Sequence, residues 1–156
     1  MQLLIIRHAR AAPSHSVPDA QRPLTDQGRR EFAVAARWLV QRGTAPGHVF
    51  HSSALRATET AEILVATIWL ADHAREAAAW LTLGTGCGEI LPMLRDLPSE
   101  VTAIVGHEPS MSTLASSLVG GGWMAFRPGT MACIDFEATA SPGLGRLAWL
   151  IDPHML

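Results

Sequence analysis

The sequence predicts an α/β protein: a three-layer sandwich whose mostly parallel central sheet carries helices on both faces. Apolar runs typical of strands alternate along the chain with segments whose apolar residues recur at helical spacing. The run at 3–6 is continuous rather than alternating, as in strands buried on both faces of a parallel sheet. With 156 residues, 48% of them hydrophobic, the chain has the size of one domain, residues 1–156.

The first strand candidate leads directly into charged residues. Residues 3–6 are all branched and apolar, and Arg7 and His8 follow them. Residues 9–24 then predict a loop, since they contain serines and three prolines, Pro13, Pro18 and Pro23. A connection this long often serves a function.

Two helices are expected around a second strand. Thr25 is a candidate N-cap for a helix that ends near Gly43, and 49–50 is a short strand candidate. The next helix begins at Ala54 or Leu55, with an expected buried stripe of Leu55, Ala61, Leu64, Val65 and Ile68. Arg56 lies in the first turn of that helix, where the macrodipole disfavours a positive charge. An anion bound at the same place would remove the conflict.

The pattern is weaker between 69 and 98. Gly84, Gly86 and Gly88 predict a flexible connection, and residues 89–97 could form only a helix that Pro92 disturbs. The later elements are clearer: a strand at 101–105, a helix from Pro109 to Gly120, and strands at 131–136 and 147–151.

Composition excludes several functional classes. The formal net charge of -2 gives no overall attraction to nucleic acid or to an anionic membrane. The apolar segment at 63–71 is too short to span a bilayer, and the one at 1–6 is too short for a secretion signal. Cys87 and Cys133, the only cysteines, are expected to be small buried apolar groups. A reducing, cytoplasmic location is therefore expected.

Four residues in separate parts of the chain are predicted to share one pocket. Arg7, His8 and His107 come at the carboxyl ends of predicted strands, and Arg56 begins the helix after a third strand. In open α/β sheets, ligands bind outside the carboxyl ends of the strands.

The residue types in this set suit phosphoryl transfer without a metal or cofactor. Guanidinium groups meet two phosphate oxygens at once, so Arg7 and Arg56 would hold the phosphoryl group. A neutral imidazole is a nucleophile at physiological pH, and His8 is the expected attacker. His107, before a predicted helix N-terminus, would be a further hydrogen-bond donor to the phosphate.

Longer motifs around these residues resemble the histidine phosphatase superfamily, and most closely its short SixA-type phosphohistidine phosphatases. They are Arg7-His8 and the segments 22–29, 52–61 and 105–109, in that order. The resemblance implies a phosphoglycerate mutase-like fold. It also implies that His8 becomes phosphorylated and that Arg7, Arg56 and His107 bind the phosphoryl group.

The sequence departs from the superfamily in two places. Ala9 stands where the superfamily commonly has glycine, which is tolerable only if φ there is negative. Larger members also have a glutamate between the second arginine and the second histidine, where this chain has no acid at 80–84. Asp19, Glu89 and Glu108 are candidate general acids, but each is expected to be a solvated charge or a cap.

The missing acid favours one substrate class. An ester leaves as a poor alkoxide and gains about 10²- to 10⁴-fold from protonation, whereas phosphohistidine carries a better leaving group. The preferred substrate is therefore phosphohistidine on a protein. The alternatives are a small phosphomonoester, a phosphate-binding module without turnover, and a metallohydrolase that uses histidines and Asp152.

The remaining histidines and aromatic residues predict no second site. His48 and His51 could suggest a metal, but on a strand they point to opposite faces. His15, His73 and His154 fall in loop-like or terminal segments and need no role. The five tryptophans are expected to be core or partly buried packing residues.

Overall fold

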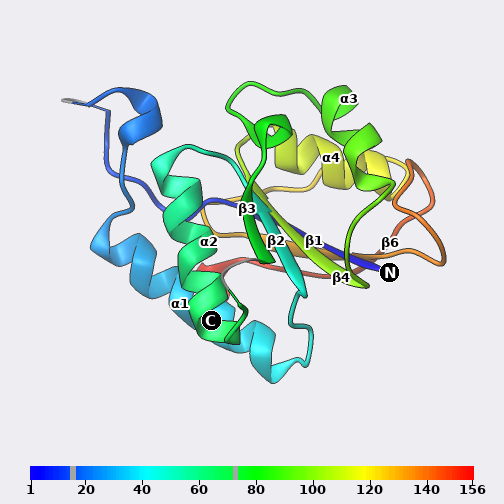
Figure 1. Ribbon diagram of the computed structural model, residues 1–156, viewed down its shortest axis with the longest axis horizontal. Helices are drawn as coiled ribbons and strands as arrows, with labels where there is room; N and C mark the ends of the chain where they lie inside the picture. Colours follow the sequence, from blue (N-terminus) through cyan, green and yellow to red (C-terminus); the bar gives the residue numbers. More distant parts are fainter. Residues whose placement is uncertain (15–16, 72–73) are drawn as a thin grey trace.

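The computed structural model describes residues 1–14, 17–71 and 74–156. Its centre is a six-stranded sheet with the strand order β3-β2-β4-β1-β5-β6 (Figure 1). The strands are β1 (Gln2–Arg7), β2 (His48–His51), β3 (Arg75–Ala77), β4 (Val101–Gly106), β5 (Met131–Asp135) and β6 (Arg146–Ile151).

The sheet is mostly parallel, as predicted. β4 pairs in parallel with β1 on one side and with β2 on the other, and β2 pairs in parallel with β3. β5 and β6 run antiparallel to their neighbours. The strands that end in the predicted site residues, β1 and β4, are therefore adjacent at the centre of the sheet.

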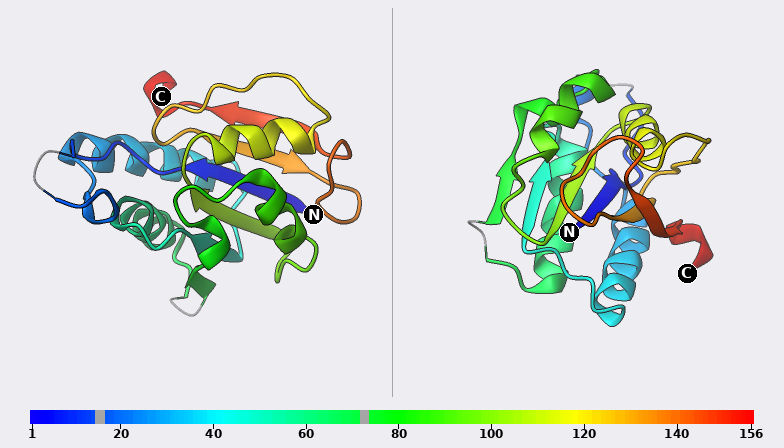
Figure 2. Two further views of the ribbon diagram at one scale, coloured as in Figure 1. Left: turned by 90° about the horizontal axis from the view of Figure 1, so that it is seen from above. Right: turned by 90° about the vertical axis from the view of Figure 1, so that its right-hand side faces the viewer.

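Helices cover both faces of the sheet, which confirms the three-layer sandwich. Two longer helices, α1 (Asp26–Gln41) and α2 (Leu55–Ile68), lie on one face. On the other face lie α3 (Cys87–Ile90) and α4 (Ser110–Leu118) (Figures 1 and 2). The 9–24 connection contains one short 3-10 turn, Asp19–Gln21.

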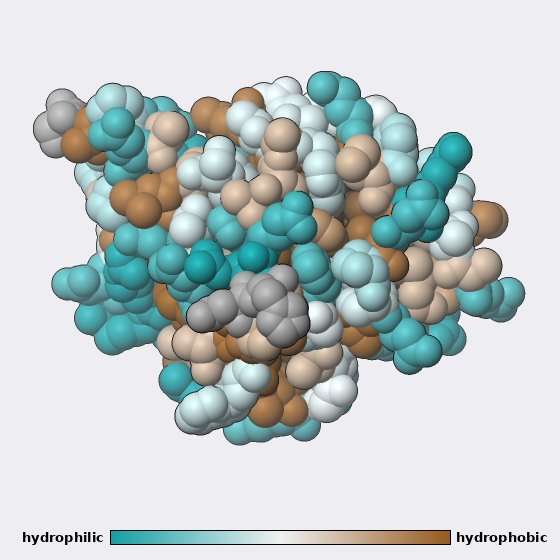
Figure 3. Space-filling model, viewed as in Figure 1, coloured by the Kyte–Doolittle hydropathy of each residue, from teal (hydrophilic) through white to brown (hydrophobic). Residues whose placement is uncertain are grey.

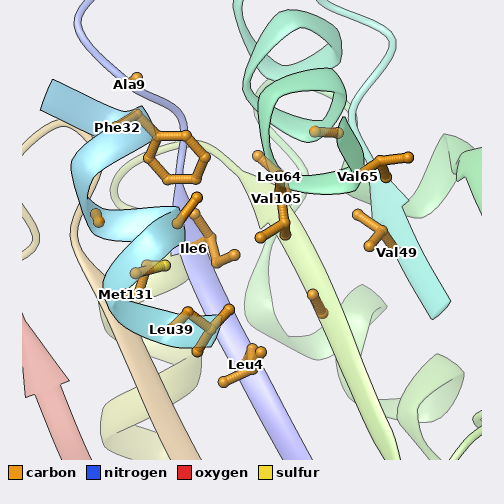
Figure 4. Close-up of a cluster of buried hydrophobic side chains, with 14 of the residues drawn as sticks. Leu4, Ile6, Ala9, Phe32, Leu39, Val49, Leu64, Val65, Val105 and Met131 are labelled. Atoms are coloured by element: carbon orange, nitrogen blue, oxygen red, sulfur yellow. The ribbon is translucent and has the colours of Figure 1, made fainter. Parts of the chain in front are cut away.

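The two hydrophobic cores follow from the alternation of side chains along β1. Leu4 and Ile6 point to α1 and α2, where they join Phe32, Leu39 and Leu64 (Figure 4). Leu3 and Ile5 point to the opposite face and pack with residues of α3 and α4. All four β1 side chains are fully buried, which explains why the run shows no polar alternation.

Local signals set the ends of α1. The Thr25 hydroxyl accepts a hydrogen bond from the N–H of Gly28 at 2.9 Å, so Thr25 is the N-cap, as predicted. Gly43 follows the helix with φ of +70°, a conformation that favours glycine.

Three expectations about helices and packing are wrong. Leu55 does not join the buried stripe of α2, because the helix starts there and its side chain faces solvent. Trp69 and Trp123 are 92% and 90% exposed rather than packed. Cys87 is only half-buried, whereas Cys133 in β5 is fully buried.

The segment from 69 to 98 contains more regular structure than its sequence indicates. β3, which the sequence did not predict, adds the edge strand of the sheet. The expected helix over 89–97 is reduced to α3 and a 3-10 turn, Leu91–Leu94, with Pro92 in its first turn.

On the face seen in Figure 3, hydrophobic residues lie in small groups between hydrophilic ones. Among the described residues, no helix is long and apolar enough to cross a membrane.

Gly28 tests how tightly α1 packs on the loop that leaves β1. A Cβ at this position would lie 2.3 Å from the backbone oxygen of Arg10. We expect Gly28→Ala to lower the free energy of unfolding by about 2 kcal/mol in urea titrations, because a backbone atom must move. Gly88→Ala is the matched control, since a Cβ there meets nothing within 4 Å. Equal stability of the two variants would contradict this packing.

Candidate active site

The structure brings the four predicted residues together at the carboxyl ends of β1, β2 and β4. Arg7 ends β1 and pairs in register with Gly106 of β4, which His107 follows. The ring centroids of His8 and His107 are 5.1 Å apart, and Nε of Arg56 donates to Nε2 of His8 at 3.1 Å. Residues from three separate segments thus form one cluster.

Backbone hydrogen bonds on two sides hold His8. Its N–H donates to the carbonyl of Gly106 at 3.0 Å, and its carbonyl accepts from the N–H of Gly129 at 3.0 Å. In the ring, Nδ1 lies 2.8 Å from the carbonyl oxygen of Ala9. Because a carbonyl can only accept, Nδ1 carries the proton. The lone pair is therefore on Nε2, which faces Arg56.

The structure accommodates Ala9 after this histidine. In the described part of the chain, Trp69 is the only non-glycine residue with a positive φ. The Ala9 side chain is buried, and its N–H donates to Oγ1 of Thr60 at 3.0 Å. Thr60 in turn donates to the carbonyl of Arg56 at 2.6 Å. This chain of bonds fixes the segment after His8 against the first turn of α2.

Arg7 and His107 each have a buried donor position with no partner in the described part of the chain. Nη1 of Arg7 donates to the carbonyl of Phe126 at 2.6 Å, but its Nε has no partner. Nε2 of His107 lies 2.8 Å from Oγ of Ser52, and its Nδ1 has no partner. Buried polar atoms are rarely left unpaired, so both atoms suit hydrogen bonds to an anion.

Asp19 also lies at this cluster, as an exposed carboxylate with two arginine partners. Nη2 of Arg56 donates to its Oδ2 at 2.8 Å, and Nη1 donates to its carbonyl at 2.6 Å. Nη1 of Arg22 donates to Oδ1 at 2.8 Å. The bonds from Arg22 and Arg56 lower the pKa of Asp19. Asp19 is therefore the anion near the first turn of α2.

The other two candidate acids are caps, as expected. Oε1 of Glu89 accepts from the N–H of Gly86 at 3.2 Å. The carboxylate of Glu108 accepts from the N–H and the hydroxyl of Ser112, at 3.2 and 2.5 Å, in the first turn of α4.

Burial keeps both site histidines uncharged at neutral pH. It lowers the pKa of His8 to about 3, and the positive charges of Arg56 and Arg7 add to this effect. Burial and the Arg56 charge lower the pKa of His107 to about 4. Burial also lowers the pKa of Arg7. The cluster therefore combines two neutral imidazoles with two guanidinium groups.

Residues inside the motifs form a scaffold that the sequence did not reveal. Oε2 of Glu59 accepts from the N–H of Leu24 at 2.6 Å, and its Oε1 accepts from Arg29 at 2.5 Å. Ser52 and Thr60 hold His107 and the Ala9 backbone. For Ser52, Glu59 and Thr60, the only sequence signal was their position in the motif 52–61. For Asp19, the only signal was its position in a Pro-rich loop.

The remaining histidines do not form a metal site within the described residues, which hold no suitable group of His, Cys, Asp and Glu. The ring of His48 packs on Phe50, and His51 is buried with Nδ1 2.9 Å from the carbonyl of Ser52. Asp152 caps the turn at His154. His15 and His73 lie outside the described residues.

Comparison with known proteins identifies the family. Residues 3–78 match the model of the histidine phosphatase superfamily (branch 1). An uncharacterized protein of Picosynechococcus is 31% identical over 125 residues, 78% of this chain and 74% of that protein. An uncharacterized protein of Mycobacterium tuberculosis is 33% identical over 112 residues, which are 70% of this chain and 67% of that protein. The chain belongs to the histidine phosphatase superfamily.

Solved structures place it among the SixA-type members of that superfamily. The protein histidine phosphatase SixA complexed with tungstate is 26% identical, with a TM-score of 0.87 over 99% of both chains. The structure named SixA from Nakamurella multipartitia is 27% identical, with a TM-score of 0.76 over 97% of this chain and 95% of that one. Membership of this superfamily supports phosphatase activity.

Ser52 is expected to control which nitrogen of His107 faces an anion. Its Oγ accepts from the N–H of Ala54 at 3.3 Å, so the hydroxyl proton can point to Nε2 of His107 and leave the proton of His107 on Nδ1. Ser52→Ala should weaken binding of inorganic phosphate about tenfold in calorimetry, since the ring of His107 loses its hydrogen bond to Oγ of Ser52. Ser53→Ala, at an exposed neighbour, is the control. Unchanged affinity in Ser52→Ala would contradict the assignment.

The lowered pKa values predict that both site histidines stay neutral well below pH 6.5. In an NMR titration, the ring nitrogen chemical shifts of His8 and His107 should change little between pH 7.5 and 5. The spectra of His8→Gln and His107→Gln assign each signal to its histidine. An unfolded histidine takes up its proton near pH 6.5. The unfolded chain thus binds more protons between pH 6.5 and about 3, and the histidine contribution to the free energy of unfolding falls as the pH falls through that window. Titration of either ring near pH 6.5 would contradict the conclusion that burial lowers the pKa of that histidine.

Proposed function

We propose that this protein is a metal-independent phosphatase that works through a phosphohistidine intermediate on His8 and removes phosphate from phosphohistidine on a protein. One observation carries the proposal. An uncharged Nε2 of His8 lies among donors from Arg7, Arg56 and His107, at 3.1 Å from Nε of Arg56. A nucleophile surrounded by fixed positive charge suits attack on an anionic phosphoryl group.

The reaction has two displacements. In the first, the lone pair of His8 Nε2 forms a bond to phosphorus and the bond from phosphorus to the substrate imidazole nitrogen breaks. The leaving imidazole keeps that electron pair and takes a proton from water. In the second, water attacks phosphorus, its proton passes to solvent, and the bond to Nε2 breaks, which restores His8. Arg7, Arg56 and Nδ1 of His107 stabilise the charge on the equatorial oxygens in both steps.

The carboxylates support phosphohistidine rather than an ester as substrate. Glu89 and Glu108 are bound to helix N-termini. Asp19 is held by two arginines that lower its pKa, so it is a poor proton donor. An alkoxide needs a proton as it leaves, whereas a phosphoramidate is less dependent on an acid. The neighbour of known structure with 26% identity is named a protein histidine phosphatase, which agrees with this substrate class.

Turnover of a histidine-phosphorylated protein and of an alkyl phosphomonoester such as glycerol 3-phosphate, measured with excess chelator present, tests the proposal. We expect the phosphoprotein to react with a kcat/KM at least about 10²-fold higher, because only the ester lacks a good way to leave. Rapid quenching should trap acid-labile phosphate on wild-type protein, and His8→Ala should show neither label nor turnover while remaining folded.

His154→Ala is the matched control, since this histidine is exposed and lies in the C-terminal turn. Faster turnover of the alkyl ester would replace phosphohistidine with a small phosphomonoester as the substrate. Phosphate binding without any label on His8 would indicate a binding module, and full activity in His8→Ala would overturn the mechanism.

A further inference from the structure

Each nitrogen of the Arg56 guanidinium donates to another part of the protein. Nε donates to His8 Nε2 at 3.1 Å, while Nη1 and Nη2 donate to the carbonyl and carboxylate of Asp19 at 2.6 and 2.8 Å. A phosphoryl group binds a guanidinium through the same planar fork of donors. These bonds use three of the five N–H donors, so a phosphoryl group that binds Arg56 through a fork of two nitrogens competes with at least one of these acceptors.

Asp19 has the chemistry of an internal substitute for that group. Its two carboxylate oxygens accept from two arginines, Oδ2 from Arg56 and Oδ1 from Arg22. Phosphoryl oxygens form the same charge-assisted bonds. We propose that the Asp19 carboxylate occupies Arg56 in place of a phosphoryl oxygen, and that the substrate phosphoryl group displaces it.

The burial of the partners indicates which side of the ion pair moves. The side chain of Arg56 is 3% exposed, whereas that of Asp19 is 41% exposed. The 3-10 turn that carries Asp19 has no buried residue. Asp19 can turn toward water and keep Arg22, itself partly exposed, but Arg56 cannot leave without exposing a buried site. Displacement of Asp19 is therefore the less costly exchange.

The exchange also changes the state of the nucleophile. While Asp19 holds the two Nη atoms of Arg56, Nε points at His8 Nε2 and occupies its lone pair. When a phosphoryl group binds Nε of Arg56 together with the Nη2 that Asp19 has released, the lone pair of His8 becomes free to attack phosphorus. Because of Asp19, the nucleophile becomes available only when an anion binds Arg56. Asp19 also favours doubly charged phosphoryl groups, because singly charged ones compete less well with a carboxylate.

This role rests on the proposed phosphoryl site but not on turnover, so anion binding tests it separately. Calorimetry should show that Asp19→Asn binds tungstate and inorganic phosphate about five- to tenfold more tightly than wild type, because the competing charge is gone. Asp135→Asn is the matched control. It makes the same change in net charge at a carboxylate paired with the exposed Arg146, and should leave anion affinity unchanged.

Unchanged or weaker anion binding in Asp19→Asn would overturn the proposal, and Asp19→Ala repeats the test if the amide variant folds poorly. A crystal structure of wild-type protein with tungstate is a second measurement. It should show the Asp19 carboxylate beyond hydrogen-bond distance of Arg56, and a carboxylate still bound there would also overturn the proposal. Tighter binding without phosphohistidine turnover would leave this role intact and refute only the proposed function.

Discussion

The site depends on the parallel pairing of β1 with β4 in one register. Arg7 lies opposite Gly106, so the residues that follow each strand, His8 and His107, emerge side by side at one edge of the sheet. A slip of one residue would move one strand by about 3.3 Å and turn its side chains to the opposite face. The buried side chains of β1 and β4 fix this register, since they pack against helices on both faces of the sheet. Core packing thus sets the distance between the two histidines.

Burial and positive charge act together at this edge. Arg56 has little contact with water and needs an acceptor, and burial, reinforced by the charges of Arg7 and Arg56, keeps both histidines neutral. The cluster is consequently prepared for an anion before one arrives. Two buried donors, on Arg7 and His107, have no partner in the part of the chain that the structure describes. The packing that keeps His8 neutral therefore also leaves buried donors that favour binding of an anion.

The sequence predicted the elements that have strong local signals. β1, the Thr25 cap of α1 and the start of α2 follow from apolar runs, a hydroxyl cap and helical spacing. The convergence of Arg7, His8, Arg56 and His107 was predictable because strand ends in an α/β sheet meet at one edge. The roles of these residues in catalysis remain predictions.

What the sequence could not predict depends on tertiary contacts. β3 is a short edge strand whose pairing with β2 is invisible in its own composition. Leu55 and Trp123 look like core residues by type, but Leu55 is partly exposed and Trp123 is almost fully exposed. Asp19 is separated from Arg56 by much of the N-terminal half of the chain, and only the path of the loop brings them together. Residue type gives propensity, whereas these positions are decided by what packs beside them.

Arg56 shows how a local conflict can indicate a function. A guanidinium in the first turn of a helix is unfavourable, because the N-terminal end already carries partial positive charge. In the structure Asp19 removes that conflict, and it does so from an exposed turn rather than from the core. A buried carboxylate would have formed a permanent ion pair and closed the site to other anions. An exposed one balances the charge while remaining replaceable, so the same contact that stabilises the unliganded fold leaves the phosphoryl position open to exchange.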